Sequence, residues 1–146
     1  MADIDSALSE LVDEFDLLGD WEERYRYVIE LVKTLSPLSD AERVEAHKVR
    51  GCASQVWLVT EPQDNGTVRF RGDSDAHIVS GLIAILLRLY SGRAPGEILV
   101  FDAKAAFEAL GLTGALSSQR SNGLASMVGR IRRDAEALSQ AGHTSA

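Results

Sequence analysis

Cysteine is almost absent from this sequence of 146 residues, which contains only Cys52. A single cysteine excludes an intramolecular disulfide and any metal site made of cysteines alone within one chain. Long apolar runs are absent as well, because the most apolar stretch, residues 78–89, is interrupted by Ser80, Gly81 and Arg88. This stretch is shorter than the roughly 20 residues that a membrane-spanning helix needs. The sequence therefore predicts no insertion into a membrane.

Basic residues are also few. The chain has 15 Lys and Arg against 22 Asp and Glu, which gives a net charge of −7 and a pI near 4.9. Binding to a nucleic-acid backbone requires a basic face, so nucleic acid is not expected as a partner. Residues 1–15 are acidic and amphipathic, whereas a secretory signal is basic and then apolar. We therefore expect a cytoplasmic protein.

Charge is unevenly distributed along the chain. Residues 1–23 contain nine acidic residues and no Lys or Arg, while four arginines follow near the C-terminus: Arg120, Arg130, Arg132 and Arg133. Such runs commonly form solvated faces that keep a protein soluble. The alternative is a surface for a protein partner.

The N-terminal third of the sequence has the period of amphipathic helices. Residues 4–18 and 20–35 place apolar side chains at helical spacing. Asp20, followed by Glu23, resembles a capping box at the start of the second helix. Residues 39–42 suggest a third, short helix.

The middle of the sequence changes to the period of β-strands. Residues 47–51 look extended, and residues 54–60 and 67–71 alternate between apolar and polar side chains. An Asn-Gly pair within residues 63–66 is a strong hairpin signal. This region therefore predicts a small antiparallel sheet.

Helical spacing returns after the sheet. Four further helices are predicted: residues 78–90, a short helix from Pro95, residues 101–110 and residues 121–138. Ser74 or Asp75 can cap the first of these. With 45% hydrophobic and 25% charged residues, the chain predicts a single α+β domain over residues 1–138, with one layer of helices on the sheet. Residues 139–146 are expected to form a flexible tail.

Cys52 is the first candidate for chemistry. A lone cysteine is often a small buried apolar residue. Here, however, Cys52 follows Gly51, whose lack of a side chain lets another group approach the sulfur. His47, Lys48 and Arg50 precede it, and nearby cations lower the pKa of a thiol. A thiolate in this position is a nucleophile.

Two other segments are weaker candidates. Residues 72–77 can form a capped turn into a helix, whose N-terminus can also stabilise an anion such as a thiolate. Arg120 precedes the last predicted helix and is either solvated or offered to a partner. A metal site of Cys52 with two histidines, His47 and His77, has no close pair of ligands to support it.

A hydrolytic triad of Cys52, His77 and Asp75 is also conceivable. The spacing of Asp75 and His77 on one turn does not naturally let the carboxylate orient the imidazole toward a distant cysteine. The local pattern alone therefore leaves the role of Cys52 open between an inert core residue and a nucleophile.

Several ordered blocks resemble the SufE family of sulfur acceptors, which includes CsdE-like proteins. Residues 49–57 resemble its cysteine motif, and residues 72–84 and 118–124 resemble its second and third blocks. Residues 21–31 resemble its N-terminal helix. The resemblance covers about residues 10–138, and three ordered blocks are more specific than any one of them.

This resemblance implies a fold shared with NifU/IscU-type scaffold proteins and a function in iron–sulfur cluster assembly. SufE-like proteins accept persulfide sulfur from a pyridoxal-phosphate-dependent cysteine desulfurase of the SufS or CsdA type, which they stimulate. They pass the sulfur on to an iron–sulfur scaffold complex, with no cofactor or metal of their own. The acceptor implied here is Cys52, on a loop expected to be sheltered until docking. The implied loop or partner contacts are Arg50, Gly51, Asp75, His77 and Arg120.

Three functional classes compete. A sulfur carrier shows no turnover without its partner and is not an enzyme by itself. A cysteine-dependent hydrolase or thiol peroxidase turns over alone. A cluster scaffold is disfavoured because one cysteine cannot by itself hold an iron–sulfur cluster. The three-block resemblance favours the carrier.

Overall fold

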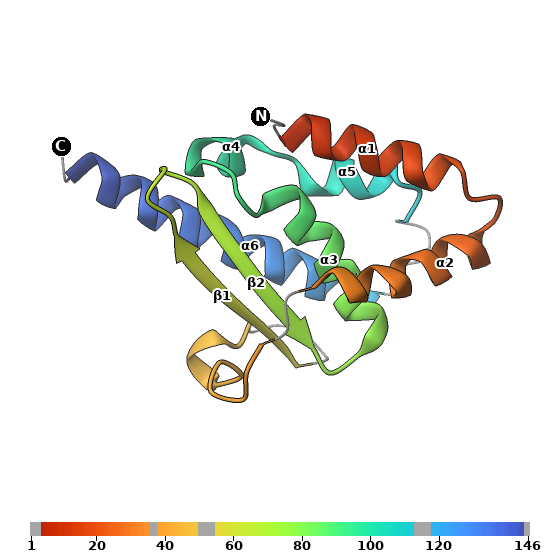
Figure 1. The fold of residues 1–146 in the computed structure, drawn as a ribbon, viewed down its shortest axis with the longest axis horizontal. Helices are drawn as coiled ribbons and strands as arrows, with labels where there is room; N and C mark the ends of the chain where they lie inside the picture. Colours follow the sequence, from red (N-terminus) through yellow and green to blue (C-terminus); the bar gives the residue numbers. More distant parts are fainter. Residues whose placement is uncertain (1–3, 36–37, 50–54, 113–117, 145–146) are drawn as a thin grey trace.

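The computed structural model describes residues 4–35, 38–49, 55–112 and 118–144. Over these ranges the chain forms six α-helices, two short 3₁₀ helices and one β-hairpin (Figure 1). The elements are, in order, α1 (Ile4–Asp16), α2 (Trp21–Glu30), η1 (Leu31–Thr34), η2 (Glu45–His47), β1 (Val56–Pro62), β2 (Val68–Ser74), α3 (His77–Tyr90), α4 (Pro95–Val100), α5 (Ala103–Ala109) and α6 (Ser118–Thr144). The predicted α+β class, with helices packed on a small antiparallel sheet, is confirmed.

The sheet consists of β1 and β2, paired antiparallel from Val56 opposite Ser74 to Pro62 opposite Val68. Apolar residues of both strands, such as Leu58 and Phe70, are buried on the face toward the helices. The predicted turn contains Gly66 with φ of +84°, a conformation that glycine adopts without strain. β2 is longer than predicted and includes residues 72–74, which the sequence had assigned to a loop.

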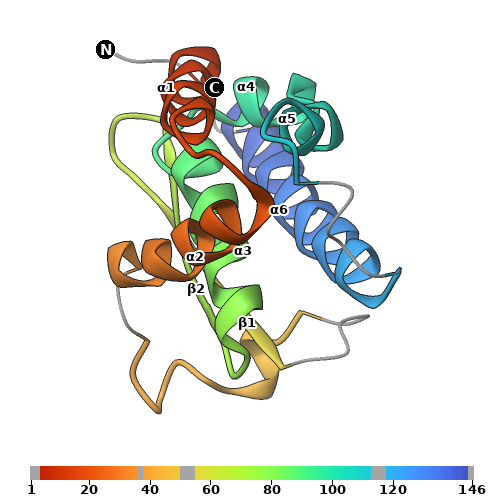
Figure 2. The ribbon, with the colours of Figure 1, turned by 90° about the vertical axis from the view of Figure 1, so that its right-hand side faces the viewer.

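Helix α3 is the centre of the core. It contacts β2, α1, α2 and α6, and Figure 2 shows it next to the hairpin, with the other helices around it. Its middle is buried on nearly every side from Ser80 to Leu87. α2 crosses it closely at Gly81, where an added Cβ would lie 2.2 Å from the carbonyl oxygen of Val28. A larger residue at this crossing has no room.

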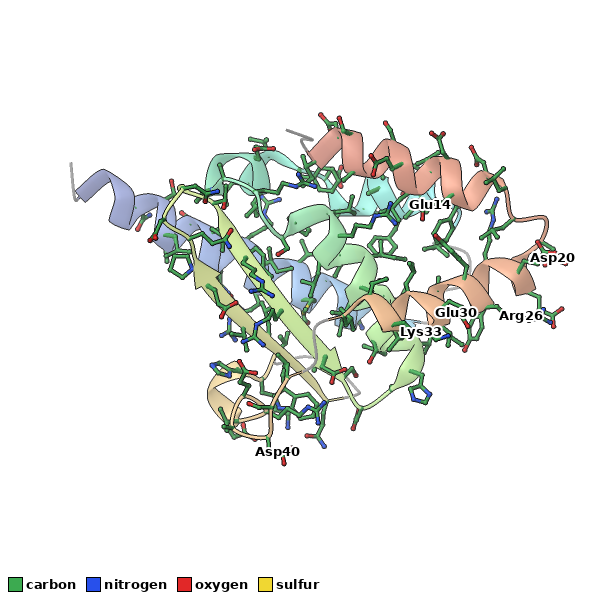
Figure 3. All side chains as sticks on the ribbon, viewed as in Figure 1. Glu14, Asp20, Arg26, Glu30, Lys33 and Asp40 are labelled. Carbon is green, nitrogen blue, oxygen red and sulfur yellow. The ribbon has the colours of Figure 1, made fainter. Side chains whose placement is uncertain are left out.

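Helix α1 is fastened to α3 by charge as well as by apolar contact. The Glu14 carboxylate accepts hydrogen bonds from the Arg88 guanidinium of α3 and from the Tyr27 hydroxyl of α2. Figure 3 labels Glu14 on the side of α1 that faces these helices. The Arg88 hydrogen bond lowers the pKa of Glu14 below its ordinary value, although partial burial opposes the shift.

Helix α6 packs mainly against α4. Its inward face repeats at helical spacing through Leu124, Met127, Ile131 and Ala135, all of which are buried. The helix begins before and ends after the predicted range of 121–138. No helix in the described ranges is both long and apolar enough to span a membrane.

Two local predictions need correction. Residues 39–42 form a single turn and not a helix, because the helical hydrogen bonding ends with the bond from the Arg43 N–H to the Ser39 carbonyl oxygen. α3 begins after Ala76 without a side-chain cap, because the side chains of Ser74 and Asp75 bind another segment.

The predicted cap of α2 is correct. The Asp20 carboxylate accepts a hydrogen bond from the backbone N–H of Glu23, at 2.9 Å. The Glu23 carboxylate reaches back to the N–H of Gly19, at 2.7 Å, one residue earlier than in a standard capping box.

Candidate functional site

The candidate residues are divided between described and undescribed parts of the chain. Cys52, Gly51 and Arg50 lie outside the described residues. Arg120 lies in the first turns of α6, and its side chain is also outside what the structure describes. Asp75 and His77 are described, as are the segments on both sides of residues 50–54. The site is therefore built from these flanking segments.

The segment before the cysteine is paired with the start of β1. Lys48 forms an antiparallel bridge with Trp57. The backbone N–H of Val49 donates to the carbonyl oxygen of Val56 at 2.8 Å, and the Val49 side chain is buried. The chain consequently enters and leaves residues 50–54 at neighbouring points.

The segment after the cysteine is held by the end of β2. The backbone N–H of Gln55 donates to the Asp75 carboxylate at 3.1 Å, and the Asp75 N–H donates to the Gln55 carbonyl oxygen at 3.3 Å. The Ser74 hydroxyl donates to the same carbonyl oxygen at 2.7 Å. Both peptide groups of Gln55 are thus bound by two consecutive residues.

His77 is the first residue of α3, and its side chain is exposed. The carboxylate of Asp75 binds the backbone of Gln55 and does not orient the imidazole of His77. The arrangement of Asp75 and His77 therefore lacks the carboxylate–imidazole contact of a hydrolytic triad.

A segment that we call the strap, residues 38–49, lies against the outward face of the sheet. Asp40, labelled in Figure 3, marks it near the start of β1 and the end of β2. Glu42 of the strap binds Arg71 of β2, and Arg43 binds Asp73 of β2 at 2.6 Å. The Arg43 guanidinium also lies 6.0 Å from the ring centroid of Trp57, within reach of a cation–π contact.

These ion pairs shift the pKa values of their members. The Arg71 guanidinium, followed by the Ser39 backbone N–H, lowers the pKa of Glu42 to about 2. The two carboxylates of Glu42 and Glu61 raise the pKa of Arg71 above its already high ordinary value. The outward face of the sheet is therefore a connected network of charges and not a freely solvated surface.

Helix α6 also reaches the strap. The Arg130 guanidinium donates to the carbonyl oxygen of Lys48 at 3.5 Å and binds Asp134 at 3.2 Å. Asp134 in turn accepts a hydrogen bond from the Thr60 hydroxyl of β1 at 2.7 Å. Figure 1 shows that β1, α3 and α6 all begin toward the same side of the molecule, where β2 ends.

The described residues give no sign of a metal cluster at this site, and one groove of the molecule lies apart from it. Within the described residues, no three His, Cys, Asp or Glu side chains are close enough together to hold a metal ion. The groove, with a volume of about 850 Å³, lies between α6 and the α4–α5 region and is lined by residues such as Phe107 and Val128.

Sequence reasoning missed the residues that hold the flanks together. It named both Asp75 and Gln55 but did not pair them, and it did not assign Glu42 and Arg71 to one another. The alternation of charged residues in β2 signals an outward face. No local signal identifies the segment that covers this face.

Comparison with known proteins identifies the family of this chain. A family model described as "SufE: Fe-S metabolism associated domain" matches residues 9–135. The chain belongs to the SufE family. In this SufE-family protein, the block of residues 49–57 and the block of residues 72–84 are bound to each other through Gln55 and Asp75.

Relatives of similar length support the assignment. An uncharacterized SufE-like protein of Rhizobium etli is 54% identical over 134 residues, covering 90% of each chain. Another, from Rhizobium meliloti, is 48% identical over 134 residues, covering 90% of this chain and 96% of the relative. The family places the protein in Fe–S metabolism.

The fold is also found in a solved structure. The solution structure of a hypothetical protein from Thermus thermophilus matches with a TM-score of 0.76 and covers 92% of this chain and 96% of its own. Its sequence identity of 19% supports a likeness of fold alone.

Proposed function

We propose that Cys52 accepts persulfide sulfur from a pyridoxal-phosphate-dependent cysteine desulfurase of the SufS or CsdA type. The observation that carries this proposal is the anchoring of the segments on both sides of the only cysteine. Val49 is bound to Val56 on one side, and Gln55 is bound to Asp75 on the other. Such anchoring suits a short segment that must present one thiolate to the active site of another protein.

The transfer is a thiol exchange that needs no electron donor. The Cys52 thiolate attacks the terminal sulfur of the persulfide on the desulfurase cysteine. A bond forms between the Cys52 sulfur and the terminal sulfur, while the sulfur–sulfur bond of the donor breaks. The desulfurase cysteine leaves as a thiolate, and the proton of the persulfide stays on the transferred sulfur. The reaction therefore causes no net oxidation or reduction.

Removal of the sulfur frees the desulfurase for another cycle, and this is how the protein stimulates its partner. We propose an iron–sulfur scaffold complex as the recipient, because a lone cysteine can carry sulfane sulfur but cannot alone hold a cluster. The protein supplies the thiolate and the docking surface, and it needs no cofactor. Arg50, Gly51, His77 and Arg120 are proposed as contacts to the loop or to the partner.

The test is the intact mass of the protein after incubation with a cognate, active desulfurase and cysteine. The wild type is expected to gain the mass of one or more sulfur atoms, and a reductant should reverse the gain. The Cys52→Ser variant should gain none. A wild type that gains no sulfur under these conditions would overturn the proposal.

A further inference from the structure

Arg71 is the point at which the strap is joined to the sheet. Its side chain projects from the outward face of β2 and is only 16% exposed. It forms two hydrogen bonds with the Glu42 carboxylate of the strap, and its Nε donates to Glu61 of β1 at 3.2 Å. One guanidinium thus binds two carboxylates from two different segments, a geometry to which the fixed fork of arginine is suited.

Glu42 makes further contacts within the strap, which leads along the chain toward the cysteine. The Glu42 carboxylate also accepts the backbone N–H of Ser39 at 3.0 Å, which closes a turn. The carbonyl oxygen of Glu42 lies 2.7 Å from Nδ1 of His47, and a carbonyl oxygen only accepts, so Nδ1 carries the proton. The next residues, Lys48 and Val49, pair with β1.

We propose that Arg71 is a positioning residue for Cys52, because through Glu42 it fixes the strap that carries the chain to the cysteine. This inference rests on the proposed function of Cys52 as the sulfur acceptor. Cys52 lies three positions after Val49 along the sequence, so the chain between them reaches at most about 10 Å. A shift of the strap therefore changes the range of positions that the Cys52 sulfur can reach.

The two carboxylates bound to Arg71 provide a matched pair of variants. Glu42→Gln removes the charge that binds Arg71, while its amide oxygen can still accept the N–H of Ser39. Glu61→Gln removes the same kind of charge from the same arginine. Glu61, however, belongs to β1 and not to the strap. Only the first variant should release the strap.

The first readout needs no desulfurase. The rate of alkylation of Cys52 by iodoacetamide is measured from pH 6 to 10 for both variants and the wild type, in conditions where urea titration shows each fully folded. Glu42→Gln should change the rate constant about fivefold, as expected from the loss of one net hydrogen bond. Glu61→Gln should leave it within about twofold of the wild type.

The second readout separates positioning from general stability. With a desulfurase, Glu42→Gln should lower the maximal rate of sulfur transfer at saturating concentration and leave the half-saturating concentration near that of the wild type. Arg71→Lys, which keeps the charge but loses the fork, should behave like Glu42→Gln in both readouts.

Equal effects of Glu42→Gln and Glu61→Gln on alkylation, or no effect of either, would overturn the positioning role. Failure of the wild type to gain sulfur would overturn the proposed function instead. The alkylation comparison does not depend on that result, so the two failures are distinguishable.

Discussion

The carboxylate of Asp75, just after β2, accepts a hydrogen bond from the backbone N–H of Gln55, just before β1, at 3.1 Å. The bond joins the two sequence blocks of the family at the point where the chain leaves the undescribed residues 50–54. The Asp75 N–H and the Ser74 hydroxyl both donate to the carbonyl oxygen of Gln55. We call these three hydrogen bonds, which hold Gln55 at the end of β2, the clasp.

Asp75→Ala should loosen the clasp. The variant loses one hydrogen bond of an exposed side chain, so its free energy of unfolding should fall by about 1 kcal/mol, and the alkylation rate of Cys52 should rise. Urea unfolding and iodoacetamide labelling measure the two effects. Asp75→Asn should stay near the wild type, because its amide oxygen can still accept. An equal loss in both variants would show that the charge, and not the hydrogen bond, matters.

Gly81→Ala should destabilise the fold strongly. The added Cβ would lie 2.2 Å from the Val28 carbonyl oxygen, so α2 and α3 must separate. Overpacking of this kind costs about 1–3 kcal/mol or more. Gly129→Ala in α6 is the control, since its Cβ meets nothing within 4 Å. That variant should gain up to about 1 kcal/mol from helix propensity. Thermal and urea unfolding compare the two, and similar stabilities would contradict the close crossing.

Two tyrosines should respond oppositely to removal of their hydroxyls. Tyr90 is fully buried, and its hydroxyl has no hydrogen-bond partner within the described structure. Burial raises its pKa to about 12. Tyr90→Phe should therefore increase the free energy of unfolding by about 1 kcal/mol. Tyr27→Phe should decrease it by a similar amount, because the Tyr27 hydroxyl binds Glu14. A destabilised Tyr90→Phe variant would indicate that water or another group satisfies the hydroxyl.

Local sequence patterns were sufficient where one segment decides its own structure. Apolar spacing predicts α1, α2, α3 and α6, because each helix must bury one face, whatever lies against it. The Asn-Gly pair likewise predicts the hairpin, because the turn residues themselves determine the local backbone geometry. Asp20 predicts the start of α2, since an N-cap binds backbone groups of its own turn.

Patterns failed where a side chain had a choice of partner. Asp75 has the sequence context of a helix cap, yet it binds Gln55, which lies 20 positions earlier. Glu42 binds Ser39 within its own turn, yet its carboxylate also binds Arg71, 29 positions later. Local propensity does not encode such distant contacts. The candidate site depends on these contacts. The sequence could therefore name Cys52 and Asp75, but not the distant residues that hold the flanking segments in place.

Acid should weaken the attachment of the strap. The pKa of Glu42 is about 2 in the folded protein, below its ordinary value of 4.5, chiefly because Arg71 hydrogen-bonds the carboxylate. A depressed folded-state pKa means that the ionised group stabilises the fold fully above about pH 4.5, and that this contribution is lost as the pH falls through about 2.

Urea unfolding of the wild type and Glu42→Gln between pH 2 and pH 6 measures this contribution. The wild type should be the more stable at pH 6, and the difference should shrink toward zero near pH 2. The slope of stability against pH should be shallower for the variant, because it lacks the titrating carboxylate. A difference that stays constant across the range would contradict the coupling of Glu42 to Arg71, since an uncharged interaction does not titrate.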